Sequence, residues 1–552
     1  MAAIGKPLKL NIMFHMHQPW YKDAQTNKYL MPFVQLHGVK DYLGMARLSK
    51  KFPKVKVTFN YVPSLVEQIK DYTDNSPKDH YRDLAMKDPR DLTHEEKAFI
   101  LKNFVVKNRL ADESLRYMEL TRNIDAGRPL SDCDFRDLQV LFYLIWFPKS
   151  VIDSDNDIEC LYHKGKDFSE SDKKCLFSRL DHYMKQIIPE VKKLQDDGIV
   201  ELTASPYYHP ILPLLHNSEF ARVNMPRKPL PKTKFRHPED ARHQIDAAVH
   251  YHNRIFGKAP QGMWPSEGSI SNQVIEPIDE AGIKWIASGQ KNLVNSLYFS
   301  RGRSTDWPVS ASELCAPWKA VSGGHSSFIV FRDDGLSDLI GFKYNKYACA
   351  TDAVNNLFWN IHNIKAELEK NPGSLGDRPG LLSLILDGEN AWEYYPGNGR
   401  YFLEELYARL SNNDEGIETA SVTDYLNQYG CPEENVLSRL SPGSWIGGDF
   451  ATWIGSPGAN KAWQALIEAR RVIGQMAGKA PSEAWDHILR AEGSDWWWWY
   501  GDRNFTEQYD LFDTLFRNNL IQVYISLGLD VPSYLYHQIN KYSQNIGESE
   551  KK

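Results

Sequence analysis

Two acidic residues follow runs of apolar residues, and both are of a type that performs chemistry. In "LLSLILDGENAWEYY" a strand-like run leads to Asp387, and Gly388 and Glu389 come next. In "GMWPSEGSIS" Glu267 follows a shorter run that contains Trp264. Cleavage of an acetal needs one carboxyl group to protonate the leaving oxygen and a second to attack or to activate water. The two segments therefore predict a catalytic pair, although either acid could instead cap the following helix.

Two histidines lie near the start of the chain, in "FHMHQPWY". The preceding residues alternate between apolar and polar, so His15 and His17 should share one face at the end of a strand. Imidazole rings in that position bind a metal ion or donate hydrogen bonds to a sugar. A metal site would need further ligands, such as His209 and a strand-end aspartate. The pattern by itself leaves both interpretations open.

Aromatic residues are abundant, with 16 tryptophans and 28 tyrosines. An indole ring stacks on the apolar face of a pyranose, so this abundance favours a sugar-binding cleft. Trp445 and Asp449 lie in a Gly-rich loop, while Asp495 and Trp496 belong to "SDWWWWYGD". All four are candidate sugar-binding residues. Some of the four consecutive indoles must still belong to the core, because one turn cannot expose them all to a cleft.

The composition is that of an enzyme-sized globular protein. The chain has 552 residues, and its net charge of −6 does not favour a nucleic-acid partner. Six scattered cysteines without a CxxC motif predict free thiols in a reducing compartment. We find no signal peptide and no span of about 20 apolar residues. These features predict a cytoplasmic protein without membrane insertion, and nothing indicates its oligomeric state.

Strand-like and helix-like segments alternate over residues 1–430. This alternation predicts an α/β fold with a parallel sheet or barrel, in which chemistry gathers at the carboxyl ends of the strands. Charged, helical periodicity over about 75–192 predicts a helical insertion. Amphipathic segments predict a C-terminal helical domain over 431–540, and a polar tail follows at 541–552.

Short motifs occur in an order that resembles glycoside hydrolase family 57, the amylase and amylopullulanase group. They are His17-Gln18-Pro19, "ASPYYHPILPLL", "MWPSEGSIS", "LDGENAWEYYP", and two later segments, "GSWIGGDFATWIG" and "AEGSDWWWWYGD". The resemblance spans nearly the whole chain. It implies an incomplete (β/α)7 barrel with a helical domain, acting with retention and without a metal or other cofactor.

The resemblance also implies roles for individual residues. Glu267 would be the nucleophile and Asp387 the general acid/base in the cleavage of α-1,4-glucosidic bonds, and in some cases also α-1,6 bonds. The substrate would be a starch- or glycogen-type glucan or a maltooligosaccharide. The expected substrate-binding residues are His15, His17, Gln18, Trp20, His209, Trp264, Arg332, Asp333, Glu389, Trp392, Trp445, Asp449, Asp495 and Trp496. Arg332 and Asp333 could equally form a structural salt bridge.

Three alternatives stay open. A 4-α-glucanotransferase would share the covalent intermediate and pass the sugar to another sugar in place of water. A metal-dependent hydrolase would use His15 and His17 as ligands. A non-catalytic glucan-binding protein would keep the fold without turnover.

Overall fold

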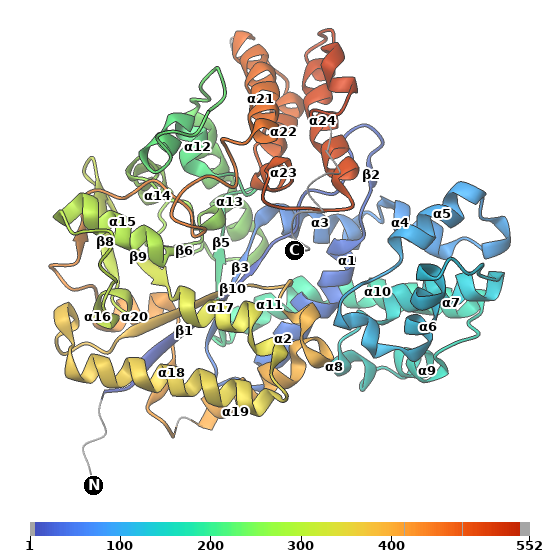
Figure 1. The fold of residues 1–552 in the computed structure, drawn as a ribbon, viewed down its shortest axis with the longest axis horizontal. Coiled ribbons are helices and arrows are strands. Elements are labelled where there is room, and N and C mark those ends of the chain that lie inside the picture. Colours follow the sequence, from blue (N-terminus) through green and yellow to red (C-terminus); the bar gives the residue numbers. More distant parts are fainter. Residues whose placement is uncertain (1–5, 413, 477, 541–552) are drawn as a thin grey trace.

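The computed structural model describes residues 6–412, 414–476 and 478–540. Its central strands, all parallel, are β1 (Leu8–Met16), β3 (Val57–Tyr61), β5 (Val200–Ala204), β6 (Gly262–Met263), β7 (Trp285–Gly289), β9 (His325–Arg332) and β10 (Leu381–Asp387). They pair in the order β10-β1-β3-β5-β6-β7-β9, and a further pairing of β10 with β9 closes the barrel (Figure 1). The predicted α/β fold with a (β/α)7-type barrel is confirmed.

Helices and short strands surround the barrel. The helices are α1 (Phe33–His37), α2 (Leu43–Lys51), α3 (Pro63–Asp74), α12 (Leu212–His216), α13 (Pro238–Phe256), α14 (Ile275–Glu280), α15 (Gln290–Arg301), α16 (Ala311–Leu314), α17 (Asp334–Phe342), α18 (Ala350–Lys370), α19 (Arg400–Asn412) and α20 (Val422–Tyr429). Strand β8 (Trp318–Ser322) is antiparallel to β9, β11 (Ile417–Thr419) is parallel to β1, and β12 (Val436–Leu437) is parallel to β8. Strands β2 (Lys28–Tyr29) and β4 (Lys78–Asp79) form a separate small sheet.

The alternation in β1 reflects two packed layers, one on each face of the strand. Ile12 and Phe14 belong to the large core that includes the surrounding helices. Met13 packs in a separate cluster with Trp264, on the inner face of the barrel. His15 comes next on that inner face, one residue before the strand ends. The alternating pattern of β1 thus places the polar side chain of His15 inside the barrel, near its carboxyl end.

A lobe of helices follows β4 and extends to one side of the barrel (Figure 1). It contains α4 (His80–Met86), α5 (His94–Asn103), α6 (Leu115–Asp125), α7 (Asp132–Leu144), α8 (Lys149–Ile152), α9 (Asn156–Lys164), α10 (Glu170–Met184) and α11 (Ile187–Asp196). Helix α11 packs against α2 and leads directly into β5. The extent of the helical insertion, about residues 75–192, stays a prediction.

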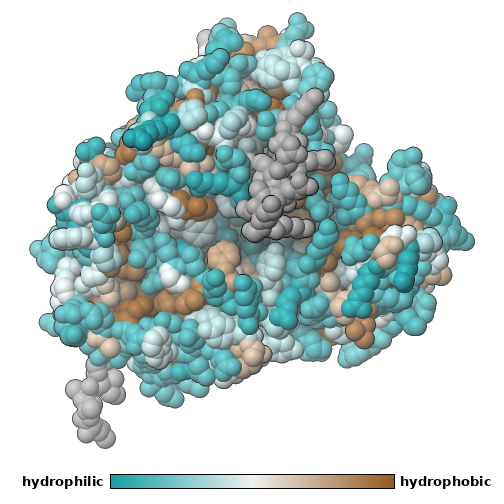
Figure 2. Space-filling view, viewed as in Figure 1, coloured by the Kyte–Doolittle hydropathy of each residue, from teal (hydrophilic) through white to brown (hydrophobic). Residues whose placement is uncertain are grey.

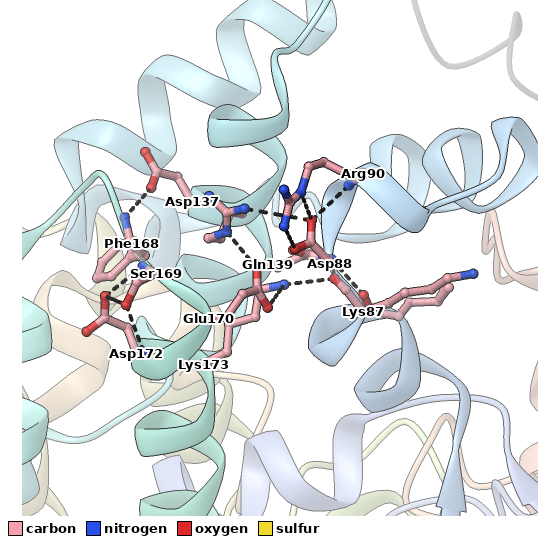
Figure 3. A network of polar contacts seen from close by, with 12 residues as sticks. Lys87, Asp88, Arg90, Asp137, Gln139, Phe168, Ser169, Glu170, Asp172 and Lys173 are labelled. Atoms are coloured by element: carbon pink, nitrogen blue, oxygen red, sulfur yellow. Dashed lines mark hydrogen bonds and ion pairs between the residues drawn. The ribbon is translucent and has the colours of Figure 1, made fainter.

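Buried polar groups hold the insertion together (Figure 3). The side-chain amide of Gln139 donates to the carbonyl oxygens of Leu84 and Lys87, at 2.7 and 3.0 Å. The fully buried ammonium group of Lys173 donates to the same Lys87 carbonyl and pairs with Glu170 at 3.2 Å. These bonds satisfy the carbonyls that would otherwise be left open at the end of α4.

The stability of the insertion should depend far more on Asp137 than on Glu119, although both pair with Arg116. The Asp137 side chain is 1% exposed and also accepts the backbone N–H of Phe168 at 3.0 Å, whereas Glu119 is 59% exposed. We expect Asp137→Ala to lower the free energy of unfolding by about 2–4 kcal/mol, because buried donors lose their acceptor. Glu119→Ala should change it by less than about 0.5 kcal/mol. Urea denaturation checks this, and equal midpoints for the two variants would contradict it.

Four further helices follow: α21 (Pro457–Gln475), α22 (Ser482–Ala491), α23 (Ser494–Tyr500) and α24 (Tyr509–Ser526). They gather at the top of the molecule in the view of Figure 1. The domain boundary near residue 430 stays a prediction, and the polar tail at 541–552 lies outside the described residues. All six cysteines are free. Among the described residues, no helix is long and apolar enough to span a membrane.

Candidate active site

The barrel brings both predicted acids to the carboxyl ends of its strands. Asp387 is the last residue of β10 and pairs in register with His15 of β1. Glu267 lies four residues after the end of β6, in the short 3-10 turn η5 (Ser266–Gly268). Figure 2 shows a hollow at the centre of this face of the molecule, between the insertion and the C-terminal helices.

Glu267 has a constrained backbone and two bonds to one tryptophan. Its φ of 57° lies in the left-handed region, which is uncommon for a residue with a side chain. The indole N–H of Trp445 donates to Glu267 Oε2 at 2.9 Å, and the Trp445 backbone N–H donates to the Glu267 carbonyl at 2.9 Å. Gly289 makes room for this loop, because a Cβ there would lie 2.7 Å from the Cα of Trp445. Such enforced backbone conformations cluster at active sites.

The two carboxyl groups share one electrostatic environment. Burial, together with the charge of Asp387, raises the pKa of Glu267 to about 8, against the opposing hydrogen bond from Trp445. Burial also raises the pKa of Asp387, while Arg332 and His17 oppose this rise. The pair therefore retains a proton near neutral pH. One ionised and one protonated carboxyl is the combination that acetal cleavage requires.

Three histidine rings stack beside the acids. The ring centroids of His17 and His209 lie 4.0 Å apart, and those of His15 and His209 lie 5.0 Å apart. His15 Nδ1 is bonded to Asn60 Oδ1 at 2.7 Å, and burial lowers the pKa of His15 to about 3. Burial likewise lowers the pKa of His209 well below its ordinary value. His15 and His209 are thus neutral donors or acceptors rather than cations.

Two of the ring nitrogens have no partner in the described part of the chain. They are the buried His17 Nδ1 and His209 Nε2. The other nitrogen of each ring is held: His17 Nε2 by Asp495 Oδ1 at 2.8 Å, and His209 Nδ1 by Ser494 Oγ at 2.8 Å. A buried polar atom without a partner is costly, so these two nitrogens are points of low stability within the site.

One ligand atom each from His17, His209 and Asp495 lies within 4.8 Å of the others, so this group could hold a metal ion. His15, the expected first ligand with His17, is instead engaged by Asn60. A metal ion in this group would thus have His209 as a ligand, as expected, but not His15.

Arg332 and Asp333 both make structural contacts. Arg332 pairs with Asp334 at 3.0 Å, and its guanidinium group lies 5.0 Å from the ring centre of Trp445. Asp333 caps α17 by accepting the backbone N–H of Leu336 at 2.8 Å. Arg332 therefore supports the tryptophan that holds the nucleophile candidate, whereas Asp333 has the role of a helix cap.

Three of the expected sugar-binding tryptophans lie in the core. Trp264, Trp392 and Trp496 are at most 1% exposed. Trp392 donates to the carbonyl of Gly388 at 3.1 Å, and Trp264 packs edge-on against Trp445 at 5.2 Å. A ring so enclosed cannot stack on a sugar, so these residues support the site from behind. Trp445 itself is part-exposed.

Gln18 and Trp20 contact residues behind the histidines. Gln18 is buried and accepts the hydroxyl of Tyr21 at 2.9 Å. Trp20 packs edge-on against Tyr208 at 5.8 Å and lies 4.4 Å below the Arg490 guanidinium. It lines a cavity of about 620 Å³ to which neither catalytic candidate contributes. The structure therefore separates Trp20 from the acids.

Glu389 and Asp449 both accept hydrogen bonds from neighbouring groups of the protein. Glu389 is 3% exposed and accepts the backbone N–H of His17 at 2.9 Å and the hydroxyl of Tyr42 at 2.7 Å. Asp449 accepts the backbone N–H of Ala451 at 2.8 Å, which closes its Gly-rich loop. Neither contact by itself indicates that the residue binds a sugar.

The sequence model of glycosyl hydrolase family 57 matches residues 11–437. The chain belongs to this family. Its fold is similar to that of a family 57 branching enzyme from Thermococcus kodakaraensis, with a TM-score of 0.56 and 14% identity over 94% of this chain and 88% of that chain. It is also similar to the alpha-amylase AmyC from Thermotoga maritima, with a TM-score of 0.56 and 12% identity over 95% and 93%.

A third similar structure is the 4-alpha-glucanotransferase from Thermococcus litoralis, with a TM-score of 0.53 and 14% identity over 94% of this chain and 60% of that chain. At these identities, the likenesses establish the fold and not the activity. Among curated proteins, none matches this family 57 chain.

Several residues of this family 57 site were missed from the sequence. Asn60 is the second-last residue of strand β3 and pairs with His15, and a polar residue near a strand end was a usable signal. Ser494 directly precedes Asp495 and holds His209. Tyr42 lies in a helical segment, and nothing local marks it as part of the site.

Proposed function

We propose that this family 57 protein cleaves α-glucosidic bonds with retention, using Glu267 as nucleophile and Asp387 as general acid/base. The observation that supports this most directly is the placement of two carboxyl groups at the carboxyl end of the barrel, Asp387 at the end of β10 and Glu267 in η5, held by Trp445. Burial raises the pKa of both groups. The enzymes with similar folds are described as a branching enzyme, an amylase and a glucanotransferase, which favours an α-1,4-glucan as substrate.

The reaction would proceed in two steps. Asp387 donates its proton to the glycosidic oxygen while a Glu267 oxygen attacks the anomeric carbon, so the C–O bond breaks and a glycosyl ester forms. The ionised Asp387 then takes a proton from water, or from the hydroxyl of another sugar. The resulting nucleophile attacks the anomeric carbon and releases Glu267 as a carboxylate.

The proton must lie on Asp387 when the first step begins. In the free protein Arg332 and His17 favour the anionic form of Asp387, so the shared proton lies more on Glu267. A glycosidic oxygen beside Asp387 accepts a hydrogen bond only from the protonated form, and the Trp445 N–H stabilises the Glu267 anion. Substrate binding thus moves the proton to the residue that uses it.

The pH dependence of kcat/KM should show where the Glu267–Asp387 pair loses this proton. Because burial raises the pKa of Glu267 to about 8 and also raises that of Asp387, the pair loses its last proton as pH rises through about 8. We expect kcat/KM to decline there, since no acid remains to protonate the leaving oxygen. Initial rates on a soluble maltooligosaccharide across the pH range would check this. A profile that stays flat well above pH 8 would contradict it.

His17, whose side chain is 12% exposed, would contact the sugar next to the bond that breaks. His209 is fully buried and would support the His17 ring by stacking on it. Asp495 would orient His17 by its bond to Nε2.

Product sizing tests the proposed function and separates hydrolysis from transfer. The protein would be incubated with amylose, with pullulan and with concentrated maltotriose. Shortening of amylose supports cleavage of α-1,4 bonds, and shortening of pullulan indicates which of its bonds is also cleaved. Net lengthening of maltotriose would identify a glucanotransferase, because a sugar then reaches the glycosyl ester before water does. No change in any substrate would argue for a non-catalytic binding protein.

A metal-dependent hydrolase is the second candidate, favoured by the grouping of His17, His209 and Asp495. Under our proposal, exhaustive dialysis against a chelator should leave the rate on amylose unchanged. Elemental analysis of the active protein should find no stoichiometric zinc. Loss of activity on chelation, with recovery on addition of zinc alone, would favour the second candidate.

A further inference from the structure

A buried π-helical turn, η1 (Gly38–Tyr42), joins α1 to α2. All its residues are buried. Gly38 lets the turn approach α10, because a Cβ there would lie 2.6 Å from the sulfur of Met184. Single π-helical turns are rare and are often found at functional sites. The last residue of this turn, Tyr42, contacts Glu389 in the loop that follows Asp387.

Tyr42 and His17 bind the same oxygen atom. The Tyr42 hydroxyl donates to Glu389 Oε1 at 2.7 Å, and the His17 backbone N–H donates to the same atom at 2.9 Å. Tyr42 is fully buried and Glu389 is 3% exposed, so water does not substitute for either donor. Since His17 Nε2 also bonds Asp495, an unbroken chain of hydrogen bonds runs from the π-helical turn to α23.

Buried charges hold the turn itself. Lys40 Nζ lies 2.6 Å from Asp41 Oδ1, and these side chains are 2% and 3% exposed. The second oxygen of Asp41 is 2.7 Å from His37 Nδ1, and the Lys40 ammonium lies 5.6 Å from the ring centre of Trp146, in the insertion. A buried ion pair is stable only with complete partners and good geometry, so these contacts restrict the turn to few conformations.

We propose that Tyr42 is a positioning residue, which acts through Glu389 to fix the His17 backbone and the segment that follows Asp387. Tyr42 has no access to substrate, so its effect on the reaction is transmitted by Glu389. The inference rests on the proposed function, because it assigns His17 and Asp387 to the reacting site. The proposal also implies that the π-helical turn, together with Trp146 of the insertion, helps to hold the site in its shape.

Tyr61 offers a matched control. It lies at the end of β3, is 1% exposed, and its ring centre is 6.0 Å from that of Tyr42. Its hydroxyl has no hydrogen-bond partner within the described residues. Tyr61→Phe therefore removes a neighbouring buried hydroxyl of the same chemistry without breaking a bond to Glu389.

Tyr42→Phe should lower kcat on a maltooligosaccharide by about 10- to 100-fold, while KM changes by less than about threefold. Tyr61→Phe should keep both constants near those of the wild type. A second measurement needs no substrate: in protein labelled with 15N-histidine, the His17 ring resonances are assigned by their loss in His17→Gln. These resonances should move in Tyr42→Phe and stay in place in Tyr61→Phe.

Unchanged kcat and unmoved His17 resonances in Tyr42→Phe would overturn the inference. If the wild type turns over no α-glucan, the proposed function fails, and the resonance measurement alone decides whether Tyr42 positions His17. If Tyr42→Phe does not fold, Glu389→Gln and Glu389→Ala replace it. Gln retains an acceptor for both donors and should keep the His17 resonances in place, whereas Ala should displace them. Unmoved resonances in Glu389→Ala would also overturn the inference.

Discussion

Glu267→Gln is expected to abolish the turnover of α-glucans, with a fall in kcat on the order of 10⁵-fold. The amide keeps the size of the side chain and can still accept the Trp445 N–H, but it cannot form the glycosyl ester. Initial rates on amylose measure the loss. Glu276→Gln is the matched control, because Glu276 is an exposed glutamate on α14 and should show wild-type rates. Residual turnover above about a tenth in Glu267→Gln would exclude Glu267 as the nucleophile.

The same variant should become more stable than the wild type as pH rises. The folded state raises the pKa of Glu267 from 4.5 to about 8, so between these values it holds a proton that the unfolded chain has released. Wild-type stability therefore falls as pH rises through this range. Gln does not titrate, so the difference in melting temperature should grow in favour of the variant from about pH 5 to about pH 9. A difference that is independent of pH would contradict the raised pKa.

Asp387→Ala is the second substitution with a large expected effect. It keeps the nucleophile but removes the proton donor of the first step and the base of the second, so kcat on amylose should fall roughly 10²–10⁴-fold. A nitrophenolate leaving group needs little protonation. On a substrate that carries it, the rate of the first step should therefore fall much less in Asp387→Ala. Asp377→Ala, at an exposed aspartate, should behave as the wild type.

Azide provides the decisive measurement on Asp387→Ala. Azide is an anionic nucleophile that needs no general base, so it should attack the glycosyl ester directly and release Glu267. We expect azide to accelerate the variant but not the wild type, and to give an α-glucosyl azide. Absence of any acceleration, together with an equal loss on both kinds of leaving group, would assign Asp387 to binding rather than to acid/base catalysis.

The barrel was predictable because its strands carry their own signals. The apolar run that ends in Asp387 and the alternation that ends at His17 both reflect burial, which is a local property of a strand. The structure places Asp387 and His15 opposite each other, as the shared strand end implied. For the same reason Asn60 was within reach of sequence reasoning, although its contact with His15 was not anticipated.

The roles of the aromatic residues were not predictable in the same way. An indole can serve either as core or as a sugar platform, and only packing decides between them. Trp496 and Trp392 are enclosed, while Trp445 is part-exposed and holds Glu267. Tyr42 was missed because its contact with Glu389 joins residues 347 positions apart. No local pattern encodes such a pairing.

The bond between His17 and Asp495 has a consequence for the growing polypeptide. Its two residues are 478 positions apart, and the Glu267–Trp445 bond likewise joins the barrel to a later segment. At a synthesis rate of about 5–20 residues per second, Asp495 leaves the ribosome roughly half a minute to a minute and a half after His17. Chains that terminate before Asp495 therefore lack this bond permanently. Under the proposed function, we expect such truncated chains to be inactive on α-glucans.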